Sequence, residues 1–91
     1  MKEIWVLTTD WAHDGEIGDN AELYEKEETA RKKFQQVVKE IRSNYSHVDF
    51  NAPDCDYNIY EDENSLEIYL KGYYFSDSQA VVLIKMPVIT D

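Results

Sequence analysis

The sequence has little cysteine, proline or glycine, and each shortage narrows the range of folds. Its 91 residues contain one cysteine, two prolines and three glycines. A single cysteine cannot form an internal disulfide, so a secreted disulfide scaffold is excluded. The 43% hydrophobic content is typical of a folded globular chain rather than a disordered one. We expect a single domain over residues 1–91.

Long hydrophobic runs are also missing. No apolar stretch approaches the roughly 20 residues that a membrane-spanning helix needs. The first residues lack the charged, apolar and small-residue pattern of a signal peptide. We therefore expect a cytoplasmic protein without a membrane partner.

Basic residues are scarce, and the chain carries a formal net charge of −10 from 19 acidic and 9 basic side chains. Within residues 26–45, six basic side chains outnumber three acidic ones and give +3, so the remainder carries −13. A field of this sign repels phosphate backbones and anionic lipids. We predict no nucleic-acid partner, whereas a basic protein surface would be attracted.

The clearest pattern is helical and covers residues 26–45. Glu27 and Glu28 at its start and Arg42 near its end complement the helix dipole. Six apolar side chains recur with a period of 3.6 residues and predict one buried stripe: Ala30, Phe34, Val37, Val38, Ile41 and Tyr45.

Five segments have the composition or the alternation of strands: residues 3–9, 21–24, 57–61, 65–73 and 80–86. Residues 10–20 are rich in glycine and aspartate and predict a loop, as does the segment 46–56 with Pro53. Turns are expected at 62–64 and 76–78. The order β-β-α-β-β-β predicts an α+β fold, with a single amphipathic helix packed on one face of an antiparallel sheet.

A single helix is narrower than a five-stranded sheet, so we expect apolar surface beyond its reach. A helix is about 10 Å wide and covers two or three strands spaced about 4.8 Å apart. The first and last strands are apolar on both faces, and we predict that Trp5, Leu7, Val81 and Leu83 lie on the uncovered face. Exposed apolar surface usually marks an interface. A protein partner or a homodimer is expected there.

Aromatic residues gather on the fourth strand and in the turn after it. By alternation, Tyr69, Tyr73 and Phe75 share the outward face with Glu67. Tyrosine is enriched at protein interfaces, whereas the acidic background disfavours stacking on nucleic-acid bases. We interpret the three aromatics as interface candidates, with plain cross-strand packing as the alternative.

The glycine- and aspartate-rich loop partly matches a calcium-binding loop. Asp10, Asp14 and Gly15 fit positions 1, 5 and 6, but Ala12 and Ala21 stand where two ligands are required. We expect an acidic loop without a metal.

The sequence offers no catalytic constellation. His13 has no nucleophile within reach in the sequence pattern, and Cys55 lies between Asp54 and Asp56, whose negative charge disfavours a reactive thiolate. Phosphate-binding glycine loops, His-x-x-x-His pairs and Cys-x-x-Cys pairs are lacking. We predict a non-enzymatic protein without a cofactor.

The N-terminal half combines the strand-like W-V-L-T-T-D, a loop of glycine and aspartate, and the run E-L-Y-E-K-E-E-T-A-R-K-K-F. This pattern resembles small uncharacterised proteins of Gram-positive bacteria and their phages. The resemblance implies a phage or mobile-element origin, but it implies no activity and no site residues.

Two functional hypotheses follow. The first is a protein–protein interaction module that works through its sheet face. The alternative is an acidic inhibitor that imitates DNA and occupies the basic groove of a nuclease or another DNA-binding protein. The −13 outside the helix favours the mimic, whereas the +3 of the helix interrupts a continuous negative stripe. Salt separates the two, because a mimic's affinity falls steeply with ionic strength and an apolar contact barely changes.

Overall fold

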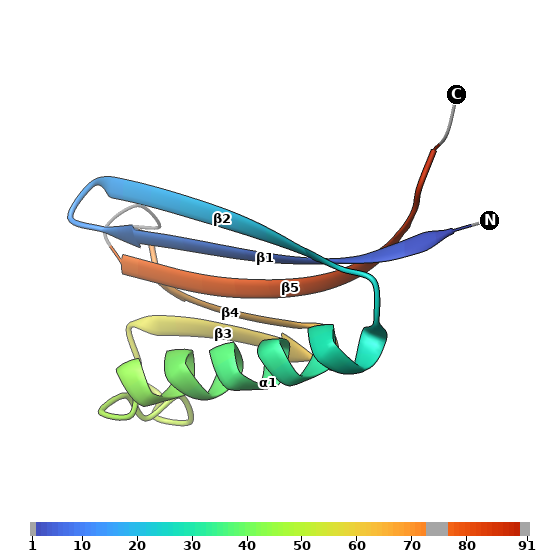
Figure 1. Cartoon of the computed structure of the whole chain (residues 1–91). Coiled ribbons are helices and arrows are strands. Elements are labelled where there is room, and N and C mark those ends of the chain that lie inside the picture. Colours follow the sequence, from blue (N-terminus) through green and yellow to red (C-terminus); the bar gives the residue numbers. More distant parts are fainter. Residues whose placement is uncertain (1, 73–76, 90–91) are drawn as a thin grey trace.

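A computed structural model describes residues 2–72 and 77–89 of the chain. Its elements are β1 (Glu3–His13), β2 (Glu16–Tyr24), α1 (Glu27–Asn44), β3 (Tyr57–Asp62), β4 (Ser65–Leu70) and β5 (Asp77–Pro87). The strands form one five-stranded antiparallel sheet, and α1 packs on one of its faces (Figure 1). The predicted fold class and the order β-β-α-β-β-β are confirmed.

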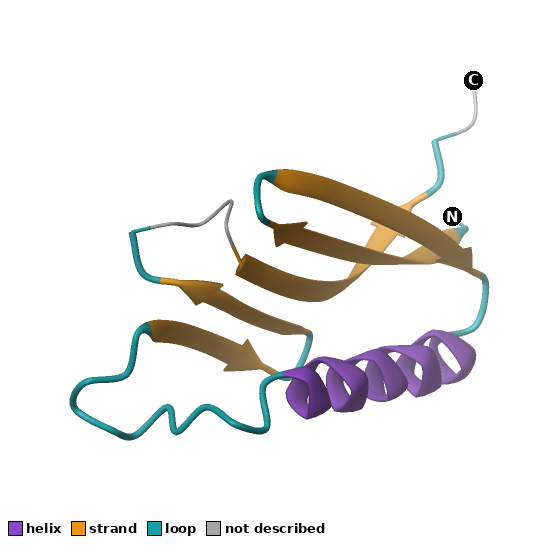
Figure 2. Ribbon diagram, turned by 90° about the vertical axis from the view of Figure 1, so that its left-hand side faces the viewer, coloured by secondary structure: helices purple, strands orange, loops and turns teal. Residues whose placement is uncertain are grey.

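The strand order β2-β1-β5-β4-β3 brings the first and last strands together inside the sheet. β1 pairs with β2 on one side and with β5 on the other, while β4 joins β5 to β3. The two edge strands, β2 and β3, come directly before and after α1 in the element order. The connection through α1 therefore carries the chain from one edge of the sheet to the other (Figure 2).

The first hairpin is longer than the sequence pattern suggested. Most of residues 10–20 belong to β1 and β2, which pair from His13 and Glu16 onward. Asp14 and Gly15 form the turn with φ of 51° and 86°. Two consecutive positive φ angles are those of a type I′ turn, which matches the twist of paired strands and favours Asp-Gly. The predicted loop was wrong because this dipeptide closes a tight hairpin.

Several element boundaries also differ from the prediction. β5 begins at Asp77, so the expected turn at residues 76–78 was wrong at Asp77 and Ser78. β4 ends at Leu70, and Lys71 and Gly72 form a turn in which Gly72 has a φ of 76°. The helix keeps its predicted extent to within one residue at each end.

The core lies between α1 and the sheet face that it covers. The helix contributes Ala30, Phe34, Ile41 and, just past its end, Tyr45, all of which are buried. The sheet contributes five buried side chains: Leu7, Leu66, Ile68, Val81 and Leu83. The predicted apolar stripe of the helix is confirmed, because Val37 and Val38 also pack against this cluster.

The predicted placement of four residues on the uncovered face was wrong. Leu7, Val81 and Leu83 are core residues, and Trp5 packs against the same cluster. Leu7 lies opposite Leu83 in the ladder, and Val81 lies opposite Leu66 of β4. β4 has only one strongly apolar face, and this face packs against the helix. The register of β4 with β5 therefore determines which face of β5, and through β5 which face of β1, packs against the helix.

Candidate protein-binding face

Six apolar side chains form a continuous surface on the sheet face opposite α1. We call this surface the apolar strip. Its members come from β1, β2 and β5 and alternate with the core residues along each strand: Ile4, Val6, Leu23, Val82, Ile84 and Met86.

The strand register places these side chains next to one another. Val6 lies between Leu23 of β2 and Ile84 of β5, and Ile4 lies opposite Met86. Directly opposed side chains on one face are close enough to contact each other. The apolar strip is therefore one patch that crosses three strands.

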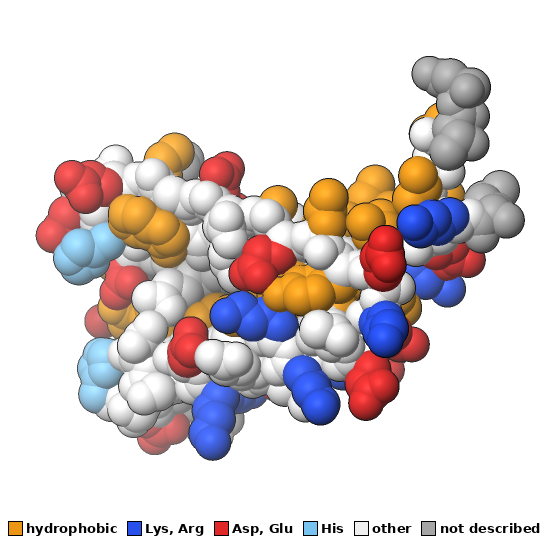
Figure 3. All heavy atoms as spheres, viewed as in Figure 1, with side chains coloured by type: hydrophobic (Ala, Val, Ile, Leu, Met, Phe, Trp, Pro, Cys, Tyr) orange, Lys and Arg blue, Asp and Glu red, His pale blue; other side chains and the backbone are white. Residues whose placement is uncertain are grey.

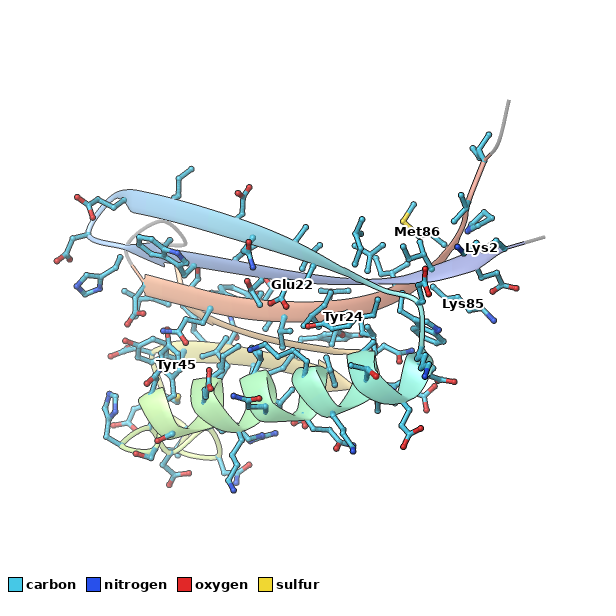
Figure 4. All side chains as sticks on the ribbon, viewed as in Figure 1. Lys2, Glu22, Tyr24, Tyr45, Lys85 and Met86 are labelled. Atoms are coloured by element: carbon cyan, nitrogen blue, oxygen red, sulfur yellow. The ribbon has the colours of Figure 1, made fainter. Side chains whose placement is uncertain are left out.

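The apolar strip is open to solvent. Leu23 is 65% exposed, and Ile84 and Met86 are each 47% exposed. In Figure 4, Met86 points away from α1, whereas Lys85 and Tyr24 lie on the helix side of the sheet. Figure 3 shows hydrophobic side chains gathered at this end of the molecule, above the helix layer. No helix or strand within residues 2–72 and 77–89 covers them.

The rest of the open face has a different character. Ala12, Ser78 and Ala80 also alternate to this side, but they are small and buried. Ile17 on β2 and Tyr60 on β3 are exposed and lie away from the strip, near the hairpin end and on the far edge strand. The exposed apolar surface of this face is thus concentrated at the start of β1 and the end of β5.

Of the three predicted aromatic candidates, Tyr69 lies within the described residues. Tyr69 lies opposite Ser78 and Asn58 and shares the open face with Glu67, as the alternation predicted. Its side chain is half-buried. Tyr73 and Phe75 lie outside the described residues.

The sequence prediction placed the wrong alternate residues of β1 and β5 on the uncovered face. It named Trp5 and Leu83, whereas their sequence neighbours Ile4 and Ile84 face outward. It did not name Leu23, which lay in the predicted strand 21–24, because residues 10–20 were expected to form a loop and the register of the hairpin was therefore not defined. The missing signal was the Asp-Gly turn, which extends β2 and places Leu23 beside Val6.

A groove of about 340 Å³ lies on the other face, between α1 and the β1–β2 hairpin. Trp11 forms one wall and is 46% exposed, with Lys33 and Glu40 on the helix side. The aromatic ring lies directly over Gly18, where an added Cβ would be 2.3 Å from Trp11 Nε1. Neither histidine nor cysteine lines this groove.

Burial and hydrogen bonds within the fold together shift the pKa values of two tyrosines and one aspartate. The hydroxyls of Tyr45 and Tyr57 both donate to Asp77, each at 2.5 Å. Burial, followed by the bond to Asp77, raises the pKa of Tyr45. The bond to Asp77, followed by burial, raises the pKa of Tyr57 to about 12. Backbone hydrogen bonding from Asn64 lowers the pKa of Asp62 at the β3–β4 turn.

The remaining candidates from the sequence lie apart from one another. Nε2 of His13 lies 3.3 Å from the carboxylate of the neighbouring Asp14, and both side chains are exposed. Cys55 is half-buried, with its Sγ 3.5 Å from the carbonyl oxygen of Tyr57. Among the described residues, no group of three or more histidine, cysteine, aspartate or glutamate side chains is arranged to hold a metal ion.

The described part of the chain contains no helix that is both long and apolar enough to cross a membrane. Comparison with protein-family models, curated proteins and solved structures found no match.

Proposed function

We propose that this protein is a non-enzymatic interaction module in the cytoplasm, which binds a protein partner through the apolar strip. The observation that carries the proposal is the uncovered position of Leu23, Ile84 and Met86 on one contiguous patch. Apolar patches of this kind, rimmed by polar residues, are typical of protein-binding surfaces.

The composition of the strip supports a protein partner rather than a charged ligand. None of its six side chains carries a charge or a hydrogen-bonding group. The nearest charged side chains lie at its ends: Lys2 pairs with Glu25 at 3.4 Å beside the start of β1, and Asp10 and Asp19 lie toward the hairpin turn. A complementary partner would present an apolar centre with basic groups toward the hairpin end.

The DNA-mimic alternative has weaker support. On the face shown in Figure 3, acidic side chains are interspersed with lysine and arginine from α1. Arg42 is paired with Glu61, and Arg31 with Glu27, so part of the negative charge is locally compensated. A mimic needs an extended, uncompensated stripe to match a duplex backbone.

Affinity capture with two matched variants tests the proposal. Ile84→Asp places a charge in the centre of the strip, and we expect the partner's affinity to fall at least about thirtyfold, since a buried unpaired charge costs about 2 kcal/mol or more. Tyr60→Ser is the control, because Tyr60 is exposed on the same face but lies on β3.

Retention of the same partner by wild type and Tyr60→Ser, but not by Ile84→Asp, supports the proposal. Equal retention by all three proteins contradicts it. A loss of binding at high salt, with no effect of Ile84→Asp, would favour the DNA mimic instead.

A further inference from the structure

The outer edge of β2 is a second surface with unusual properties. β2 has nine residues, and among the described residues it pairs only with β1. Proteins commonly block such edges with charged side chains, above all lysine, or with proline, a bulge or a very short strand. β2 has no lysine, proline or bulge, and its charged residues are Glu16, Asp19 and Glu22. The opposite edge strand, β3, has only six residues and ends in Glu61 and Asp62. We infer that β2 pairs with the β2 strand of a second copy of this chain.

The hairpin geometry determines which backbone groups face the free edge. In a two-residue type I′ hairpin, His13 and Glu16 form a hydrogen-bonded pair, and such pairs recur at every second residue. The backbone of four residues of β2 therefore faces outward: Ile17, Asp19, Ala21 and Leu23. The same alternation on β1 predicts that the backbone of Lys2 faces β5. The carbonyl oxygen of Lys2 does accept a 2.9 Å hydrogen bond from the backbone amide of Val88.

Only a few registers let outward-facing residues of two copies meet. When two identical strands pair antiparallel about a twofold axis perpendicular to the sheet, the numbers of every two opposed residues have the same sum. The outward-facing residues are all odd-numbered, so this sum is even and the axis passes through a residue rather than between two. The central choices are Asp19, Asn20 and Ala21. Each choice fixes every opposed pair along the strand.

The axis at Asn20 gives the most favourable pairs. It places Ile17 opposite Leu23, the two most exposed apolar side chains of β2, and it uses all nine residues. It sets each acidic residue opposite an uncharged one: Asp19 opposite Ala21, Glu22 opposite Gly18, and Glu16 opposite Tyr24. Like charges are never directly opposed between the copies, which favours this register because directly opposed like charges destabilise a sheet.

The neighbouring registers are worse. An axis at Asp19 puts this carboxylate opposite its own copy and sets Glu16 opposite Glu22. An axis at Ala21 puts Ile17 opposite Glu25 and Asp19 opposite Leu23, which pairs apolar with charged side chains. The sequence of β2 is thus self-complementary in one register.

The resulting dimer would have one continuous sheet of ten strands, twice the five of one copy. Four hydrogen-bonded pairs, each exchanging two bonds, would add about eight backbone hydrogen bonds between the copies. The twofold axis keeps both α1 helices on the same side and both apolar strips on the other. Leu23 is the one member of the apolar strip that this pairing uses. The pairing otherwise depends on the strand edge, so it does not require that the strip binds a partner.

The diagonal neighbours across the axis carry charge. Asp19 lies diagonally from its own copy, and Glu22 lies diagonally from Glu16, at separations of about 7–8 Å. Exposed charges at this distance repel one another and are screened by salt. We therefore expect the dimer to strengthen as ionic strength rises.

Cysteine cross-linking tests the register directly, in a Cys55→Ser background that removes the native thiol. Two Asn20 residues directly opposed in a non-hydrogen-bonded pair have Cα atoms about 4.5 Å apart, within the range of a disulfide. Asn20→Cys should form a covalent dimer under mild oxidation at least about tenfold faster than Ala21→Cys, whose copies are diagonal and too distant. Both positions are exposed in the monomer, so their intrinsic reactivities are comparable.

Sedimentation of the unmodified protein supplies the second measurement. We expect a dimer at protein concentrations of hundreds of micromolar, and its proportion should rise in half-molar salt. Ala21→Pro should abolish the dimer while the circular dichroism spectrum stays unchanged. The inference is overturned if Asn20→Cys cross-links no faster than Ala21→Cys, or if the unmodified protein remains a monomer throughout. Ile84→Asp should leave the cross-linking rate unchanged, which separates failure of this inference from failure of the proposed function.

Discussion

Tyr45, the residue that follows α1, donates its hydroxyl to Oδ1 of Asp77, the first residue of β5, at 2.5 Å. Tyr57, the first residue of β3, donates to the other oxygen of the same carboxylate. The two tyrosine rings also contact each other edge to face, with centroids 5.4 Å apart. One carboxylate therefore ties the end of the helix to two strands of the sheet.

Removal of this carboxylate should lower the free energy of unfolding more than removal of either tyrosine hydroxyl. Asp77→Ala leaves two partly buried hydroxyls without their acceptor, and we expect the free energy of unfolding to fall by about 2–3 kcal/mol. Tyr45→Phe or Tyr57→Phe should each cost about 1 kcal/mol, because Asp77 keeps one donor. Urea unfolding measures all three. An Asp77→Ala protein as stable as wild type would show that the two bonds contribute nothing to the fold.

The same cluster should make the fold sensitive to alkali. The pKa values of Tyr45 and Tyr57 are raised above 10.0, that of Tyr57 to about 12. When the pKa of a group is higher in the folded state than in the unfolded state, the group stabilises the fold fully at pH values below its unfolded-state pKa. This stabilisation is lost as the pH rises from the unfolded-state pKa to the folded-state pKa. We expect stability to decline from pH 10.0 toward about 12, and Tyr57→Phe to reduce this decline. A pH-independent stability across that window would contradict the cluster's assigned role.

Gly18 should not tolerate a side chain. Its Cβ would lie 2.3 Å from Nε1 of Trp11, so Gly18→Ala must displace the indole, and we expect a loss of about 1–3 kcal/mol with a change in tryptophan fluorescence. Gly72→Ala is the control, because the φ of 76° imposes strain while no atom of residues 2–72 and 77–89 lies within 4 Å of an added Cβ. That variant should lose stability without a change in fluorescence.

Arg31 should be more important than its neighbours on the polar side of the helix. Its guanidinium donates to the carbonyl of Glu63 at 2.8 Å and to Asn64 Oδ1 at 2.9 Å, and it lies 5.9 Å from the ring centroid of Trp5. Arg31→Lys removes the planar donor pair, so we expect a loss of about 1–2 kcal/mol in thermal or urea unfolding. Lys32→Ala, an exposed neighbour, should change stability by less than about 0.5 kcal/mol.

The sequence was sufficient for the fold class because its signals were local. The 3.6-residue stripe around Phe34 and Ile41 predicted the helix, and the clean alternation of Leu66 and Ile68 predicted β4 and its inner face. These patterns depend only on the period of each element. They can be recognised without knowing which residues elsewhere in the chain pack against the element.

The candidate site could not be assigned in the same way. β1 and β5 are apolar on both faces, so alternation alone does not distinguish Leu83 from Ile84. The decision comes from the non-local pairing of Val81 with Leu66, which connects β5 to the unambiguous face of β4. Likewise, Leu23 lay in a predicted strand, but its position beside Val6 follows from the register that the Asp14–Gly15 turn sets.

The most direct test compares the unfolding free energies of Ile84→Asp and Leu83→Asp, two adjacent positions on opposite faces of β5. If the apolar strip serves binding rather than folding, Ile84→Asp should stay within about 1 kcal/mol of wild type. Leu83, which is 2% exposed, should not accept a carboxylate, and its variant should unfold or lose more than about 4 kcal/mol. A comparable loss in both variants would mean that Ile84 belongs to the core, and the open face would then not be a binding surface.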